Sequence, residues 1–215
     1  MRKRLSLKTR RRDLSAEVFR AHYEYRHIPM GLAHVGVFQW RKYVRNYIQT
    51  PLEGEPYFDC VTEFWTADDY DDALLQDFVK SEAFQPLDQD DHLFLDITKR
   101  FSLDLKSEVL AGATEPEGSA KTMLLWRAGR ELNTARNAVA PVVEALADRT
   151  LFATLDVSRS PSPDAAPFDC ILTLWTKTPL TGADFIGRGP SGPRYIASIE
   201  SVETPRAQLF PGAFH

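Results

Sequence analysis

The sequence predicts an α+β protein built from two similar halves. The nine-residue segment FDCVTEFWT at 58–66 recurs as FDCILTLWT at 168–176, with five identical residues. A repeat at a spacing of about 110 residues is typical of a duplicated domain and not of a short solenoid unit. Strand-like alternation and helix-like periodicity also follow one another in the same order in the two halves. We therefore expect two related units that pack together and enclose a cavity.

In the first half the predicted order is strand, helix, strand, strand, helix, strand. Asp13 and Ser15 offer N-cap oxygens to the first helix, and Pro29 ends it. Asp68 or Asp69 caps the second helix, whose apolar residues form one stripe. The predicted elements are a strand at 4–9, a helix at 16–27, strands at 43–50 and 58–66, a helix ending near 78 and a strand at 100–109.

The second half repeats this order less completely. A linker that contains glycine and proline separates the halves, which gives a first domain at 1–110, a linker at 111–120 and a second domain at 121–215. Residues 178–192 hold two prolines and four glycines in place of the second helix, so this segment is a lid candidate. The other predicted elements are strands at 121–127, 151–157, 168–176 and 195–202, and a helix at 131–148 that breaks near Pro141.

Strand, helix and strand, taken twice, give the ferredoxin-like βαββαβ arrangement. Its antiparallel sheet carries helices on one face, and two such sheets packed open face to open face form a closed, pseudo-twofold α+β barrel. Strand alternation divides the segment 58–66 into two faces. The face expected to lie under the helices holds Phe58, Cys60, Thr62 and Phe64. The face expected to line a partly polar cavity holds Asp59, Val61, Glu63 and Trp65.

The composition is that of an ordinary globular protein, with 43% hydrophobic and 26% charged residues. The net charge of −4 gives no support to a nucleic-acid partner. The basic start, MRKRLSLKTRRR, is interpreted as an edge strand with solvated cationic flanks, and the alternative is an arm for an anionic partner or for targeting. Because no signal peptide or membrane-spanning run is recognised, we expect a cytoplasmic protein without a membrane partner.

Cys60 and Cys170 occupy equivalent positions of the repeat. Neither has the closely spaced partner cysteine that a zinc site needs, so we expect two buried, reduced thiols, with a disulfide or metal pair as the alternative. The sequence also contains no phosphate-binding glycine loop, nucleophile elbow or redox CxxC motif. We therefore expect no nucleotide, flavin, metal or other cofactor.

Four stretches of the first half, FRAHYEYRHIPM, WRKYVRN, FDCVTEFW and DDHLFLD, resemble the EthD family of the dimeric α+β barrel superfamily over about residues 8–109. The second half resembles the same fold only through FDCILTLW. The resemblance implies a pair of ferredoxin-like domains around a ligand cavity. It also implies small enzymes of polyketide tailoring and of aromatic or ether breakdown. Related barrels include lactone isomerases, cofactor-free monooxygenases and haem proteins, so the resemblance narrows the fold more than the reaction.

His27 is the first candidate for catalysis, because a neutral imidazole accepts and returns a proton near physiological pH. The resemblance places it in the histidine motif of the family. The alternative is a structural histidine that ties the helix end to the sheet. His22 lies five residues earlier, about 140° around a regular helix, so the two are not expected to face the same point. They form no HExxH motif, and no zinc site is predicted.

Glu63 is the second candidate, as a proton carrier, because burial beside Trp65 would disfavour the charged form of its carboxylate. Asp59 lies about 13 Å away along the same strand and is expected to hold a turn. Arg45 is predicted to bind a carboxylate or enolate, with Asn46 donating a hydrogen bond to a carbonyl oxygen. The alternative for their strand is a solvent-facing edge.

Aromatic and histidine side chains of the first half are predicted to line the binding pocket, although aromatic residues at strand spacing also form plain core. His92 is placed at the cavity mouth, with a surface histidine as the alternative. The predicted substrate-binding residues are His22, Tyr23, Trp40, Tyr43, Asn46, Trp65 and His92.

Together these residues predict a cofactor-independent acid–base enzyme, either a lyase such as a dehydratase or decarboxylase, or an isomerase. The predicted substrate is a hydrophobic carbonyl, phenolic or lactone compound of secondary or aromatic metabolism. The alternatives are a cofactor-free monooxygenase and a non-catalytic protein that binds a small molecule or haem. Because the chain supplies both halves of the barrel, a homodimer would use surfaces outside the barrel.

Overall fold

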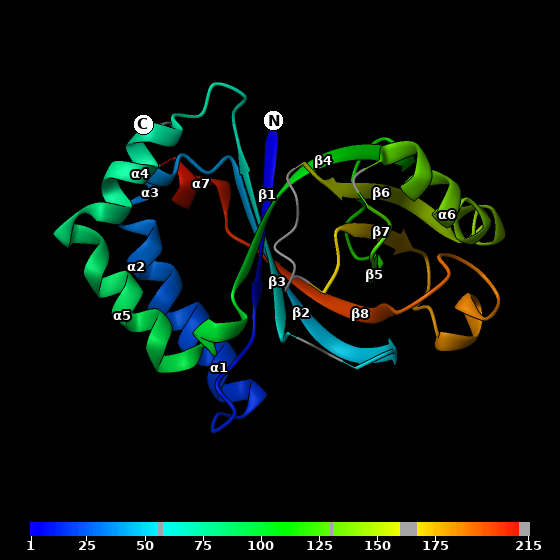
Figure 1. The fold of residues 1–215 in the computed structure, drawn as a ribbon, viewed down its shortest axis with the longest axis horizontal. Helices are drawn as coiled ribbons and strands as arrows, with labels where there is room; N and C mark the ends of the chain where they lie inside the picture. Colours follow the sequence, from blue (N-terminus) through cyan, green and yellow to red (C-terminus); the bar gives the residue numbers. More distant parts are fainter. Residues whose placement is uncertain (56–57, 130, 160–166, 211–215) are drawn as a thin grey trace. The chain divides into compact units, whose positions relative to one another are not determined.

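The computed structural model describes residues 1–55, 58–129, 131–159 and 167–210. It is an α+β structure, as predicted, and its strands and helices are drawn in Figure 1. The strands are β1 (Arg2–Lys8), β2 (Lys42–Glu53), β3 (Cys60–Thr66), β4 (Phe101–Ala111), β5 (Ala120–Trp126), β6 (Thr150–Ser158), β7 (Cys170–Thr176) and β8 (Arg194–Glu203). Their hydrogen-bonded order is β1-β3-β2-β8-β5-β7-β6-β4, the order of a closed barrel.

The first helical segment of the chain is longer than predicted. It runs through α1 (Ala16–His22), a π-helical turn (Tyr23–His27) and α2 (Ile28–Leu32). The other helices are α3 (Val35–Phe38), α4 (Asp72–Lys80), α5 (Gln85–Phe94), α6 (Leu132–Ala145) and α7 (Arg206–Leu209). Single 3₁₀ turns lie at Glu82–Phe84, Ile97–Lys99 and Gly182–Phe185.

The predicted start of the first helix is correct and the predicted end is wrong. The Ser15 side chain accepts a hydrogen bond from the Val18 N–H and caps α1. Pro29 does not end the helix, because it lies in the first turn of α2, where a missing N–H is tolerated. Between these two points the Ile28 N–H donates to the Tyr23 carbonyl, which is the wider hydrogen-bonding pattern of a π-helix.

The chain divides into two compact units. Unit 1 comprises Met1–Arg45, Phe58–Ser102 and Val202–His215, and unit 2 comprises Asn46–Tyr57 and Leu103–Ser201. The strands β2, β4 and β8 contribute residues to both units, so this division follows packing and not the repeat. The domains predicted from the repeat, 1–110 and 121–215, describe how the chain arose, and they stay a prediction.

In unit 1, β1 and β3 form an antiparallel ladder in which Lys8 stands opposite Cys60 and Lys3 stands opposite Trp65. The interpretation of the basic start as an edge strand is wrong, although Arg12 beyond the strand is exposed, as predicted for a solvated flank. Lys3 and Lys8 are only 5% and 7% exposed, and β1 has a neighbouring strand on each side in the strand order. Lys3 and Lys8 point to opposite faces of β1, and each is buried on its own face.

In unit 2, β7 pairs with both β5 and β6, and α6 packs on their apolar face. Pro141 lies inside α6, which runs unbroken to Ala145 and is shorter than predicted. The glycine-rich segment after β7 forms a 3₁₀ turn, closed by a reciprocal capping box between Thr181 and Asp184, with Phe185 fully buried. The lid role suggested for this segment stays a prediction.

The two cysteines were predicted to be buried, reduced thiols. Cys60 and Cys170 are both free and buried in the structure, which confirms that prediction. Burial raises the pKa of the Cys60 thiol to about 12, so it carries no charge at neutral pH.

Candidate functional site

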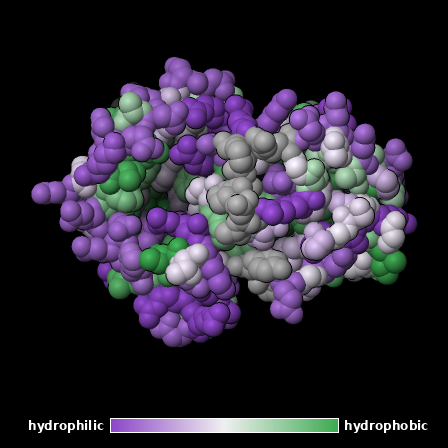
Figure 2. Space-filling model, viewed as in Figure 1, coloured by the Kyte–Doolittle hydropathy of each residue, from purple (hydrophilic) through white to green (hydrophobic). Residues whose placement is uncertain are grey.

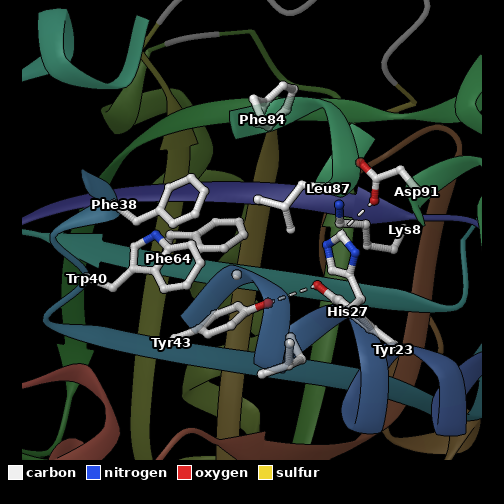
Figure 3. Close-up of a pocket in the computed structure, with 12 residues that line it drawn as sticks. Lys8, Tyr23, His27, Phe38, Trp40, Tyr43, Phe64, Phe84, Leu87 and Asp91 are labelled. Atoms are coloured by element: carbon white, nitrogen blue, oxygen red, sulfur yellow. Dashed lines mark hydrogen bonds and ion pairs between the residues drawn. The ribbon is translucent and has the colours of Figure 1, made fainter. Parts of the chain in front are cut away.

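Unit 1 contains a cavity of about 120 Å³ between its helices and its strands (Figure 3). Over these helices, Figure 2 shows hydrophobic side chains gathered beside a hollow in a mostly hydrophilic surface. The volume lies below the roughly 300 Å³ at which ordinary ligand pockets begin, so the cavity suits a small molecule. The lining residues are Lys8, Tyr23, His27, Ile28, Gly31, Phe38, Trp40, Tyr43, Phe64, Phe84, Leu87 and Asp91.

The face of β3 under the helices forms one wall of this cavity. Phe64 lines it directly, and Thr62 lies on the same face two residues earlier. The division of this strand into two faces is as predicted. The lined cavity, however, was predicted on the face that holds Glu63, and this cavity lies on the helix-covered face. Strand alternation separates two faces, but it carries no information about which of them is hollow.

His27 projects from the π-helical turn toward the cavity, where two neighbouring carboxylates flank its ring. The Nδ1 atom lies 3.0 Å from Asp90 Oδ2, and Nε2 lies 3.6 Å from Asp91 Oδ1. Burial lowers the pKa of His27 below its ordinary value of 6.5, and this effect outweighs the attraction of Asp91. His27 is therefore mostly neutral at pH 7, in the state that accepts a proton.

Asp90 is the centre of a buried ionic cluster. Its side chain is 1% exposed, and it also lies 3.1 Å from His22 Nε2 and 2.8 Å from Arg26 Nε. The two histidines were expected to face different points, and this expectation is wrong. In a π-helical turn, residues five apart come onto the same side of the helix, so His22 and His27 reach one carboxylate. His22 stacks on Phe94 and supports the cluster, whereas His27 lines the cavity.

Asp91 and Lys8 complete the polar end of the cavity. Figure 3 shows Lys8, His27 and Asp91 pointing toward one another. Asp91 Oδ2 accepts a hydrogen bond of 2.7 Å from Arg100, while its Oδ1 is buried and has no hydrogen-bond partner within the described residues. Burial lowers the pKa of Lys8 below its ordinary value of 10.5, against the opposing effect of Asp91.

Two tyrosine hydroxyls form a second polar group beside the cavity. The Tyr23 hydroxyl lies 2.9 Å from Thr62 Oγ1. It also lies 3.3 Å from the Tyr43 hydroxyl (Figure 3). Burial raises the pKa of both tyrosines well above the ordinary value of 10.0. Both therefore stay protonated at neutral pH and remain able to donate a hydrogen bond.

The opposite end of the cavity is aromatic. The rings of Phe38 and Trp40 stack with centroids 4.5 Å apart and planes 4° apart. Trp40 also lies against Phe64 at 5.2 Å and against Tyr43 at 4.5 Å. Flat, rigid ring faces of this kind favour a planar, apolar ligand. The cavity thus joins an aromatic end to a polar end with a base.

Glu63 and Trp65 lie on the other face of β3 and do not line this cavity. Glu63 Oε2 lies 3.0 Å from Lys3 Nζ, and both side chains are almost completely buried. Lys3 also lies 5.0 Å from the centroid of the Trp65 ring. The structure therefore gives Glu63 an ion-pair partner and separates it from His27.

Arg45 and Asn46 were predicted to act as a pair, but they follow one another on β2 and point to opposite faces. Arg45 forms two hydrogen bonds with Glu24, of 3.0 and 2.8 Å, behind the Tyr43 ring. Asn46 Oδ1 accepts a hydrogen bond of 2.7 Å from Lys121. Neither side chain lines the cavity, and the alternative of a solvent-facing edge is wrong, because both are buried.

His92 is not among the residues that line the cavity. Its side chain is 53% exposed on α5 and lies 4.0 Å from Asp88, which agrees with the surface alternative. Asp59 accepts a hydrogen bond of 2.8 Å from the Arg10 N–H and forms an ion pair with the Arg10 side chain, which agrees with its predicted structural role.

The sequence analysis missed Lys8, Asp90 and Asp91. The two aspartates are part of the stretch DDHLFLD, in which only the histidine was considered. A signal was present, because Asp91 follows Leu87 by four residues and precedes Phe94 by three, on the apolar stripe of α5. A carboxylate within an apolar stripe indicates a buried partner or a functional site.

A metal ion and a haem are two groups that such a cavity could hold. Within the described residues, no group of three or more His, Cys, Asp and Glu side chains could hold a metal ion. A haem does not fit this cavity, because a volume of about 120 Å³ is too small for a porphyrin. No helix of the described residues is long and apolar enough to cross a membrane.

Comparison with solved structures identifies the fold. An anthrone oxidase-like protein aligns with a TM-score of 0.54 and 9% identity, over 99% of this chain and 96% of that chain. A candidate monooxygenase from Lactobacillus acidophilus aligns with a TM-score of 0.46 and 10% identity, over 95% of this chain and 96% of that chain. A candidate monooxygenase from Fusobacterium nucleatum aligns with a TM-score of 0.45 and 11% identity, over 93% of this chain and 91% of that chain. No family model and no curated protein matches the chain. The likeness to the anthrone oxidase-like protein shows a shared fold and carries no information about the reaction.

Proposed function

We propose that this protein is a cofactor-independent enzyme that moves protons on a small, planar carbonyl or phenolic compound. The observation that carries the proposal is His27, which borders an aromatic cavity, is hydrogen bonded to the buried Asp90 and has a lowered pKa. A base that is neutral at pH 7 and held in one orientation is what proton abstraction requires.

Asp90 sets the tautomer of His27 in this proposal. When Nδ1 carries the proton and donates it to Asp90 Oδ2, Nε2 has a free lone pair for the substrate. Nε2 then removes a proton from the carbon next to a carbonyl group, or from a phenolic hydroxyl. Asp91 Oδ1, at 3.6 Å, stabilises the imidazolium that forms until the proton returns to the product.

The tyrosine pair supplies the oxyanion donors. Tyr43 and Tyr23 both line the cavity, and their raised pKa values keep them neutral. A hydroxyl that is already placed in a dry site stabilises an enolate or phenolate oxygen more strongly than water does. Arg45 and Asn46 were predicted to have this role, and the tyrosine pair replaces them in the proposal.

A cofactor-free oxygenase is the second candidate function. The same deprotonation would give an electron-rich substrate anion for molecular oxygen, in a cavity whose aromatic walls exclude water. Oxygen consumption distinguishes this reaction from dehydration, decarboxylation or isomerisation. A protein that only binds the compound would show ligand affinity that responds to His27→Ala, without any turnover.

We also propose that the chain is a tandem duplication of an EthD-like, ferredoxin-like unit. The register of the repeated strands supports this origin, since Lys3 pairs with Trp65 on β3 as Lys121 pairs with Trp175 on β7. The strand order supports the ferredoxin-like assignment, because β8-β5-β7-β6 repeats the order β4-β1-β3-β2.

The experiment is exchange of carbon-bound protons in D₂O, measured by NMR on a panel of small aryl ketones and phenols. Mass spectrometry of compounds that co-purify with the protein guides the choice of the panel. We expect exchange with the wild-type protein and a loss of about 10²-fold or more in His27→Gln, with the fold unchanged. If no compound that binds in the cavity exchanges a proton or turns over, the proposal fails.

A further inference from the structure

The side chain of Lys8 has an unusual environment for a lysine. It lines the cavity and is 7% exposed. Its Nζ lies 6.0 Å from the centroid of the Tyr23 ring, and within the described residues no hydrogen bond or ion pair holds the ammonium. A buried lysine usually has a carboxylate partner, because an isolated buried charge is unfavourable.

The other buried lysines provide the contrast. Lys3 lies 3.0 Å from Glu63, and Lys121 donates to Asn46 over 2.7 Å. Both occupy the face of their strand that this cavity does not reach. At the position of the repeat equivalent to Lys8, unit 2 has Trp126, so a cation is not needed there for folding. Lys8 is therefore the buried lysine whose nitrogen is available to a ligand.

We propose that Lys8 binds an aldehyde or ketone covalently, as an imine, at the polar end of the cavity. The inference rests on the proposed function only in sharing its cavity and its carbonyl substrate class. Burial supports it, because the lowered pKa of Lys8 increases the share of the neutral amine, which is the nucleophile.

The chemistry balances without a cofactor. The amine nitrogen adds to the carbonyl carbon, and the resulting carbinolamine loses its oxygen as one molecule of water, so amine plus carbonyl gives imine plus water. The amine proton passes to Asp91 Oδ1, which faces the same end of the cavity, and returns to the departing hydroxyl. The imine takes up one further proton from bulk water, and the protonated imine then draws electrons from the neighbouring carbon, which makes the proton that His27 removes more acidic.

The test is reductive trapping with benzaldehyde and sodium cyanoborohydride at low ratios of aldehyde to protein. Cyanoborohydride reduces the imine to a stable secondary amine, and peptide mass spectrometry then locates the added benzyl group. We expect Lys8 to be modified at least about tenfold faster than an exposed lysine such as Lys80. Benzyl alcohol, which has no carbonyl group, should slow this labelling by competition.

Two variants separate this inference from the proposed function. His27→Gln should lose proton exchange but keep trapping at Lys8, and Lys8→Met should lose the adduct while circular dichroism reports a native fold. Labelling of Lys8 no faster than that of Lys80 overturns the inference and leaves the role of His27 standing. Trapping at Lys8 with no exchange by any variant would support the covalent site and remove the proposed function.

Discussion

The helix-covered layers of the two repeated strand pairs hold very different side chains. In unit 1, the layer over β1 and β3 contains the cavity with its base, its lysine and its tyrosine pair. In unit 2, the layer over β5 and β7 is an apolar core packed against α6. The unit 1 positions Lys8, Ser6 and Thr62 correspond to the unit 2 positions Trp126, Leu124 and Leu172.

The opposite faces of the same strands changed much less. Lys3 lies over Trp65 at 5.0 Å, and Lys121 lies over Trp175 at 4.8 Å. One face thus has a lysine–tryptophan pair in both units, while the other face is polar in unit 1 and apolar in unit 2. The difference supports the proposal that the chemistry resides in the helix-covered layer of unit 1, because the corresponding layer of unit 2 is a packed apolar core.

The largest expected effect on stability is at Asp90. This carboxylate lies beside the cavity of unit 1, whereas the corresponding layer of unit 2 is an apolar core. Asp90→Ala leaves His22, His27 and Arg26 without their buried partner and should destabilise the protein by about 3 kcal/mol. Urea unfolding measures this change. Asp88→Ala, at a half-exposed site on the same helix, is the matched control and should change stability by less than about 0.5 kcal/mol. Equal losses would mean that the cluster is not what holds α5.

A smaller effect, of opposite sign, is expected at Lys8. Lys8→Met makes this position apolar, as in unit 2, and removes a buried cation that lacks a carboxylate partner. It should stabilise the protein by about 1 kcal/mol and raise Tm by about 2–4 °C. Lys3→Met is the control, and it should destabilise the protein because it leaves Glu63 buried without this ion pair. A destabilised Lys8→Met would mean that Lys8 serves the fold.

The smallest expected effect is the pH dependence that His27 contributes. Its pKa in the folded protein lies below 6.5, so below pH 6.5 the unfolded chain binds the proton more readily than the folded protein does. The contribution of His27 to the free energy of unfolding is complete above pH 6.5 and is lost as the pH falls. Urea unfolding at pH 7.5 and 5.5 should show a larger loss of stability between the two pH values for the wild type than for His27→Gln. A larger loss in the variant would assign the opposite sign to the shift.

The sequence predicted the fold more completely than the site. The repeat, the two faces of β3 and the buried cysteines followed from alternation and spacing, which are local properties. The presence of His27, Tyr23, Trp40 and Tyr43 at one cavity followed from the resemblance and from helix and strand patterns. These patterns gave no indication of which face of β3 borders the cavity, so Glu63 was placed on the lined face.

Two further features required three-dimensional information. Helix propensities describe the α-helix and do not predict a π-helical turn, so the shared contact of His22 and His27 with Asp90 was not expected. Lys8 was predicted on the polar side of a half-buried edge strand, where a lysine is ordinarily exposed. Its burial depends on β1 lying between two other strands.

The most direct test of the account compares one residue from each face of β1 and β3. We would measure proton exchange into a bound aryl ketone for the wild type, His27→Gln and Glu63→Gln under identical conditions. If the helix-covered layer is the active site, the rate of proton exchange should fall by about 10²-fold or more in His27→Gln. In Glu63→Gln, which is expected to be less stable, the rate should fall by less than about tenfold. A loss in Glu63→Gln that equals or exceeds the loss in His27→Gln would contradict the account and return the active site to the face first predicted.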